Sequence, residues 1–73
     1  MSPKQVVDQL LHQRLLADYS QRELAKRAGI HYTTLARIEV GLNNPNLTIL
    51  LKLLSALNIQ PSDFFKEIES RDH

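Results

Sequence analysis

The chain has 73 residues, of which 42% are hydrophobic, and its formal net charge is +1 at pH 7. This length fits one small domain, which buries only about 60% of its unfolded surface, so dimer formation is an obvious source of added stability. Cysteine is absent, which excludes disulfides and thiolate metal sites. The three histidines lie too far apart in sequence for a helical ligand pair, and we expect no metal or other cofactor.

The hydrophobic residues are spread along the chain in short runs. No run approaches the roughly 18 residues that span a bilayer, and the N-terminal residues lack a cleavable apolar segment. We therefore expect a soluble, cytoplasmic protein with no membrane partner.

Helical spacing dominates, so we predict an all-α domain of five helices. The first helix, residues 3–17, opens with Ser2 as N-cap, Pro3 at the first helical position and Gln5 completing a capping box. Its apolar positions recur at helical spacing. They are Val6, Val7, Leu10, Leu11, Leu15 and Leu16.

The second helix, residues 21–28, opens with a second capping box, formed by Ser20 and Glu23. Gly29 follows it directly, where a left-handed helix end favours glycine. The third helix is predicted over residues 32–40, with Leu35 and Ile38 facing inward.

The segment LNNPN is a predicted loop, because asparagine and proline favour turns. Asn46 can cap a fourth helix over residues 47–57, which Asn58 can close. Pro61 opens a fifth helix over residues 61–69, and the final SRDH is an expected frayed tail. The core positions of the fourth helix are predicted to be Leu50, Leu53, Leu54 and Leu57.

The second and third helices, joined by a short turn containing Gly29, have the layout of a helix-turn-helix over residues 20–40. In this motif the second helix enters the major groove of DNA, with one face apolar and the other able to form hydrogen bonds. The third helix meets that requirement. Its outward residues are Tyr32, Thr33, Ala36, Arg37 and Val40.

Arg37 is the strongest base-reading candidate, because a guanidinium can bond both O6 and N7 of guanine. A surface salt bridge is its structural alternative. Thr33 can contact a base edge or a phosphate, and Tyr32 is placed for a phosphate or an edge contact. His31 has two open roles, as N-cap or as a phosphate contact.

The order SQRELAKRAGI, TTLARIEVG and NPNLTILLKLLSALNI resembles the phage-repressor-like helix-turn-helix family, the Cro/repressor or Xre group, over about residues 6–66. The resemblance implies a compact five-helix lambda-repressor-like fold, binding to an operator as a symmetric dimer, and gene regulation. It matches Tyr32, Thr33 and Arg37 to base-contacting positions, with His31 at the edge of that set.

The resemblance assigns further roles by position. It places Ser20 and Gln21 against phosphate at the start of the second helix, and Asn43 and Asn44 in a loop along the DNA backbone. It also matches Arg14 and Glu39 to a buried ion pair between the first and third helices.

The chain departs from the family in the loop after Gly41, which is often basic there and is uncharged here. Fewer charged phosphate contacts predict weaker nonspecific affinity and a shallower salt dependence. Arg22, Lys26 and Arg27 are either phosphate clamps or a solvated face. Residues 14–37 carry five basic and two acidic side chains, whereas residues 60–73 carry two basic and four acidic ones. This difference in charge would turn the motif toward DNA and the C-terminal helix away from it.

The fourth and fifth helices, about residues 47–69, carry more apolar residues than one core needs, which marks an interface. The candidate dimer residues are Ile49, Leu51, Phe64 and Phe65. A monomer whose phenylalanines fold over a thin core is the alternative.

The whole chain, residues 1–73, is thus interpreted as one DNA-binding domain of a transcriptional regulator, a homodimer on a palindromic double-stranded operator. It is not expected to be an enzyme, since no nucleophile, base and orienting group converge. A protein-interaction module, such as an antitoxin that binds a toxin or another regulator, is the alternative. Small family members include controller proteins, phage repressors and antitoxins, and the residues do not choose among them.

Overall fold

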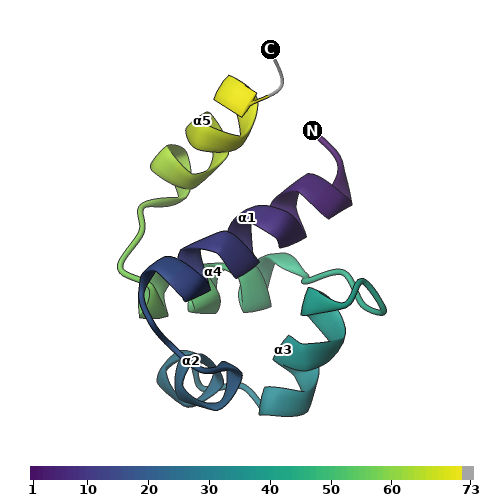
Figure 1. The fold of residues 1–73 in the computed structure, drawn as a ribbon, viewed down its shortest axis with the longest axis vertical. Coiled ribbons are helices and arrows are strands. Elements are labelled where there is room, and N and C mark those ends of the chain that lie inside the picture. Colours follow the sequence, from purple (N-terminus) through teal and green to yellow (C-terminus); the bar gives the residue numbers. More distant parts are fainter. Residues whose placement is uncertain (72–73) are drawn as a thin grey trace.

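The computed structural model describes residues 1–71 as five α-helices joined by short loops (Figure 1). They are α1 (Pro3–Leu16), α2 (Gln21–Ala28), α3 (Tyr32–Glu39), α4 (Leu47–Ala56) and α5 (Pro61–Arg71). An N-cap side chain accepts a backbone N–H at the start of each of the first four helices. These caps are Ser2, Ser20, His31 and Asn46, and the two serines form the predicted capping boxes.

The helix ends follow local backbone chemistry. Gly29 adopts φ 73° at the end of α2, and Asn58 adopts φ 58° just after α4, both in the left-handed region. The fifth helix runs two residues beyond its predicted end, because the Ser70 hydroxyl donates to the Lys66 carbonyl at 3.1 Å and Arg71 pairs with Glu67. The predicted fraying is therefore wrong for residues 70–71, and its remainder lies outside the described residues.

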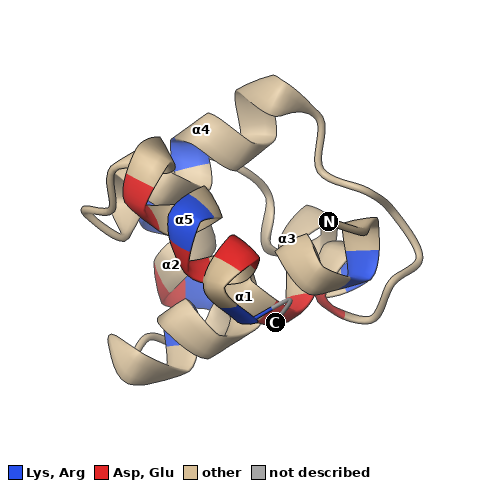
Figure 2. Cartoon of the chain, turned by 90° about the horizontal axis from the view of Figure 1, so that it is seen from above, with Lys and Arg blue, Asp and Glu red and all other residues tan. Residues whose placement is uncertain are grey.

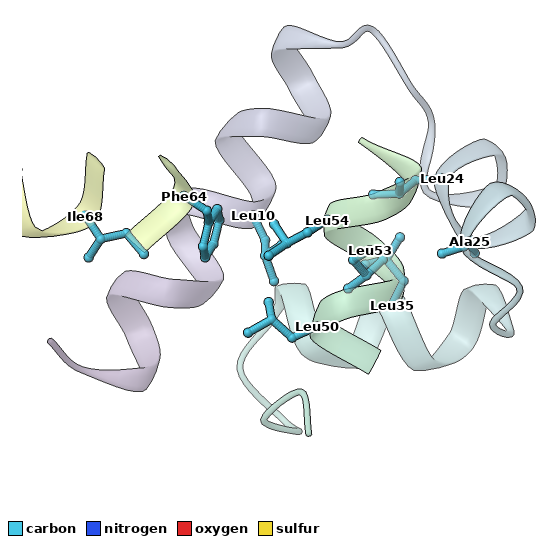
Figure 3. Close-up of a cluster of buried hydrophobic side chains, with 10 residues drawn as sticks. Leu10, Leu24, Ala25, Leu35, Leu50, Leu53, Leu54, Phe64 and Ile68 are labelled. Atoms are coloured by element: carbon cyan, nitrogen blue, oxygen red, sulfur yellow. The ribbon is translucent and has the colours of Figure 1, made fainter. Parts of the chain in front are cut away.

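One apolar core joins the five helices (Figure 3). Leu53 lies at its centre with no exposed surface, between α2 and α3 residues on one side and α1 and α5 residues on the other. The buried cluster comprises Leu10, Leu24, Ala25, Ala28, Leu35, Leu50, Leu53, Leu54, Phe64 and Ile68. The core prediction for α4 holds for Leu50, Leu53 and Leu54, while Leu57 is only partly buried.

The last turn of α1 differs from the apolar pattern of the sequence. Leu15 and Leu16 are 61% and 67% exposed, because the stripe that faces the other helices runs through Val7, Leu10 and Arg14. Residues 15 and 16 lie about 100° and 200° around the helix from position 14 and so point away from that stripe. Gln9 is buried instead, which hydrophobic spacing gave no reason to expect.

The motif and the last helix lie at opposite ends of the molecule, which measures 34 × 24 × 21 Å (Figure 1). Helices α2 and α3 form one end, α5 forms the other, and α1 and α4 connect them. No helix within residues 1–71 has the length and apolar character needed to cross a membrane.

Candidate nucleic-acid interface

The α3 helix divides sharply into an inner and an outer face. Leu35 and Ile38 are 0% and 1% exposed and fix the inner face in the core. Tyr32, Arg37 and Val40 are exposed on the outer face, and Thr33 is half-buried at its margin. This is the division that a helix needs in order to lie in a major groove while remaining anchored to its own domain.

Glu39, at the last turn of α3, is the acceptor for two other helices. Its Oε2 lies 2.7 Å from Arg14 Nε, and its Oε1 accepts from Arg14 Nη2 at 3.0 Å and from Gln21 Nε2 at 2.8 Å. Arg14 also donates from Nη1 to the Tyr19 carbonyl at 2.8 Å. The side chains of Arg14 and Glu39 are only 12% and 4% exposed.

This network ties α1 and the start of α2 to the end of α3. A bidentate contact between guanidinium and carboxylate is directional, so it fixes orientation as well as distance. The pair expected from the resemblance is therefore present in the structure, and Gln21 is a third member that the sequence interpretation placed only against phosphate. One amide N–H and the carbonyl of Gln21 remain for other contacts.

His31 caps α3: its Nδ1 accepts the Thr33 backbone N–H at 3.1 Å. An accepting Nδ1 leaves the ring proton on Nε2, and because His31 is an exposed residue this N–H can still donate to a phosphate. The two roles left open for His31 are therefore compatible. Ser20 likewise caps α2 with its oxygen and keeps its hydroxyl proton for a second contact.

Two aromatic contacts involve arginines of α2. Arg22 Cζ lies 3.9 Å from the centroid of the Tyr32 ring, which also stacks against His31 with centroids 5.1 Å apart. Arg27 Cζ lies 4.7 Å from the centroid of the Tyr19 ring. The spacing of residues along one helix could not predict either contact, because each contact joins residues from two different segments of the chain.

The loop after α3 is exposed at Asn43 and Asn44. The backbone N–H groups of Leu42 and Asn43 both donate to the Arg37 carbonyl, at 2.9 and 3.3 Å, which holds the loop beside the end of the helix. The Arg37 side chain is exposed and has no acidic partner among residues 1–71. Its guanidinium is thus left to meet an external group, and the salt-bridge alternative finds no partner there.

The charge of the motif lies on its surface. Arg14 contributes little to the outside, since it is paired and nearly buried. Four basic residues remain exposed on α2 and α3, namely Arg22, Lys26, Arg27 and Arg37. Acidic and basic positions are interspersed along α5 at the other end (Figure 2).

The expected dimer residues are separated by the fold. Phe64 is 1% exposed in the core, so its assignment to an outer interface is corrected: its ring fills the space beside Leu10 and Leu54 (Figure 3). Phe65 packs edge-on against Phe64 and is half-buried. Ile49 is half-buried, and Leu51 is 42% exposed between two hollows of about 290 and 650 Å³.

Within residues 1–71, no three histidine, cysteine, aspartate or glutamate side chains are grouped so that they could hold an ion.

Three comparisons with known proteins were made. A model of the helix-turn-helix family matches residues 10–64. A crystal structure of a point mutant of the restriction-modification controller protein C.Esp1396I has the same fold, with a TM-score of 0.87 and 21% sequence identity, over 90% of this chain and 86% of that one. A search of curated protein sequences found no match.

The family match spans most of the chain and includes both helices of the motif. Helices α2 and α3, the turn between them and the helices that support them all pack around one core. The chain thus belongs to the phage-repressor-like helix-turn-helix family of DNA-binding transcriptional regulators.

Proposed function

We propose that the chain binds a palindromic DNA operator as a homodimer, with α3 of each subunit in the major groove. One observation carries this proposal: the network around Glu39 and the buried Leu35 and Ile38 hold α3 so that Tyr32, Thr33 and Arg37 remain outward. An arginine and a hydroxyl side chain on a helix that fits the groove are the groups that read base edges.

Contacts to the DNA backbone come, in this proposal, from both sides of α3. Ser20, Gln21 and His31 stand at the helix starts, where backbone N–H groups favour phosphate. Asn43 and Asn44, in the loop after α3, lie along the DNA backbone on the other side of that helix. Phosphate contacts set the register of the protein on the duplex, and base contacts then supply the sequence preference.

Leu51 supports the dimer part of the proposal. It is exposed on α4 between two hollows, and the half-buried Ile49 and Phe65 lie on α4 and α5. A palindromic site requires a two-fold axis that sets the two copies of α3, the recognition helices of this proposal, about 34 Å apart, one turn of DNA. One structural neighbour is a restriction-modification controller protein, which supports a regulatory role for a small domain of this kind.

The test is selection of a preferred site from random duplex DNA, followed by titration of that site with the wild type and Arg37→Ala. The selected site should contain an inverted repeat, and the variant should lose about 1–3 kcal/mol of discrimination at one position of each half-site. Selected sequences that share no common site, or an equal loss of affinity for every base substitution, would refute a base-reading role for Arg37.

The oligomeric state has its own test. Leu51→Glu should shift the sedimentation of the protein toward the monomer. Leu15→Glu should not, because residue 15 is even more exposed, at 61% against 42%, but lies at the end of α1. A wild-type protein that sediments as a monomer at all concentrations would contradict the dimer.

A protein-interaction module is the competing function, and the exposed Leu47 and Leu51 of α4 favour it. Salt titration with random duplex DNA separates the two, because the logarithm of a DNA-binding constant falls linearly with the logarithm of the salt concentration. Absence of binding at low salt would favour the interaction module.

A further inference from the structure

Tyr32 lies at the start of α3, where its own helix offers the ring little support. It is the first residue of α3, and helical side chains lean toward the N-terminus, so no earlier turn of its own helix lies beneath it. Tyr32 is 38% exposed. Its contacts are therefore made with residues outside the helix, Arg22 on α2 and His31 in the turn.

Arg22 is available for this contact because nothing else in the described chain engages its charge. It has no acidic partner among residues 1–71, and the carboxylate of the adjacent Glu23 accepts the Ser20 backbone N–H at 3.3 Å. A planar guanidinium stacks on an aromatic face and keeps its N–H groups free at the edge. With its Cζ 3.9 Å from the ring centroid, the Arg22 guanidinium lies over the Tyr32 ring in a cation–π contact.

We propose that Arg22 is a positioning residue that holds the Tyr32 ring in one orientation at the entrance of the recognition helix and thereby sets base discrimination through Tyr32. This inference rests on the proposed DNA-binding function. Arg22 then acts in two separable ways. Its charge attracts phosphate equally for every sequence, whereas its stacking on Tyr32 affects only the position that Tyr32 contacts.

Lysine separates these two effects. Arg22→Lys keeps the positive charge but replaces the planar group by a compact, strongly hydrated ammonium that stacks poorly. Arg27→Lys is the matched control, because Arg27 lies on the same helix and stacks on Tyr19, which is outside the recognition helix.

The first measurement is made without DNA. Arg22→Lys should shift the ring-proton resonances of Tyr32 in the NMR spectrum and leave the methyl resonances of Leu35 and Ile38 in place. Arg27→Lys should shift the Tyr19 ring instead. Unmoved Tyr32 resonances in Arg22→Lys would overturn the positioning role, whatever the protein binds.

The second measurement uses the duplex selected by the wild type and its single-base variants. Arg22→Lys should keep the salt slope and lose about two- to fivefold discrimination at the position where Tyr32→Ala also loses it, the range that an exposed cation–π contact supplies. The two changes should combine less than additively in the double variant. Arg27→Lys should leave discrimination unchanged.

Failure of the inference and failure of the function give different results. A wild-type protein that prefers no sequence refutes the proposed function and the inference with it. A wild type that selects an operator, together with Arg22→Lys that discriminates as well as the wild type, overturns the positioning role alone. A loss of about one unit of salt slope in Arg22→Ala, without loss of discrimination, would identify Arg22 as a phosphate clamp only.

Discussion

Replacing Glu39 by alanine tests whether the buried network holds the domain together. The substitution removes the acceptor of three hydrogen bonds, two from Arg14 and one from Gln21. Arg14 would keep its bond to the Tyr19 carbonyl, but its charge would be left without a counter-ion at 12% exposure. Removing one partner of a buried pair is costly mainly because the other remains charged and desolvated.

The expected loss is about 3–5 kcal/mol of the free energy of unfolding. A domain of this size has a total stability of about 4–11 kcal/mol, so Glu39→Ala removes a large fraction of it. Since each kcal/mol lowers the melting temperature of such a small domain by about 4–8 °C, the variant should melt at least about 12 °C below the wild type.

Thermal and urea unfolding followed by circular dichroism measure this loss. Asp8→Ala is the control, because the Lys4–Asp8 pair has the same 2.7 Å separation but its side chains are 84% and 57% exposed. The control should change stability by less than about 1 kcal/mol. Equal melting temperatures for Glu39→Ala and Asp8→Ala would refute the reasoning, since burial would then add nothing to the pair.

Three further predictions concern other parts of the chain. Gln9 is 2% exposed and its amide forms no hydrogen bond within the described residues, so Gln9→Met should raise the urea midpoint by an equivalent of about 1–3 kcal/mol. Lower stability instead would indicate a water held in the small hollow between α1 and α5. Gly29 has φ 73° and open space where a Cβ would stand, so Gly29→Ala should cost about 1–2 kcal/mol in thermal unfolding, from backbone conformation alone. The log–log salt slope of operator binding should be no steeper than about −7 for a dimer with four exposed basic residues per motif, and a steeper slope would require contacts outside the motif.

Local signals predicted most of the fold, because caps act within a few residues. The Ser2 and Ser20 capping boxes, the Asn46 cap and Gly29 all occur where the sequence placed them. Burial was less predictable, since it depends on which face of a helix meets its neighbours. Leu15 and Phe64 show this in opposite directions. Leu15 fits the apolar pattern of α1 but is exposed, whereas Phe64 was expected at an interface and is buried in the core.

The candidate site was predictable in its outline and not in its connections. Helical periodicity alone separates the inner Leu35 and Ile38 from the outer Arg37. The Gln21 bond to Glu39 and the Arg22 contact with Tyr32 each join two helices, and the relative placement of helices is set by the packed core. The position of Gln21 in the motif was therefore enough to predict a phosphate contact, but it could not predict the hydrogen bond to Glu39.

The buried network around Glu39 also matters for the proposed DNA binding, because the proposed interface carries little charge. The loop over residues 41–46 is uncharged, and Arg14 is withdrawn into its pair, so few phosphates can be neutralised. In the proposed complex, this small electrostatic contribution makes binding depend more on how closely α3 matches the major groove. That match depends on the angle of α3, which Glu39 fixes against α1 and α2. Conservative changes at Glu39, such as Glu39→Gln, should therefore weaken operator discrimination at temperatures where the domain is still fully folded.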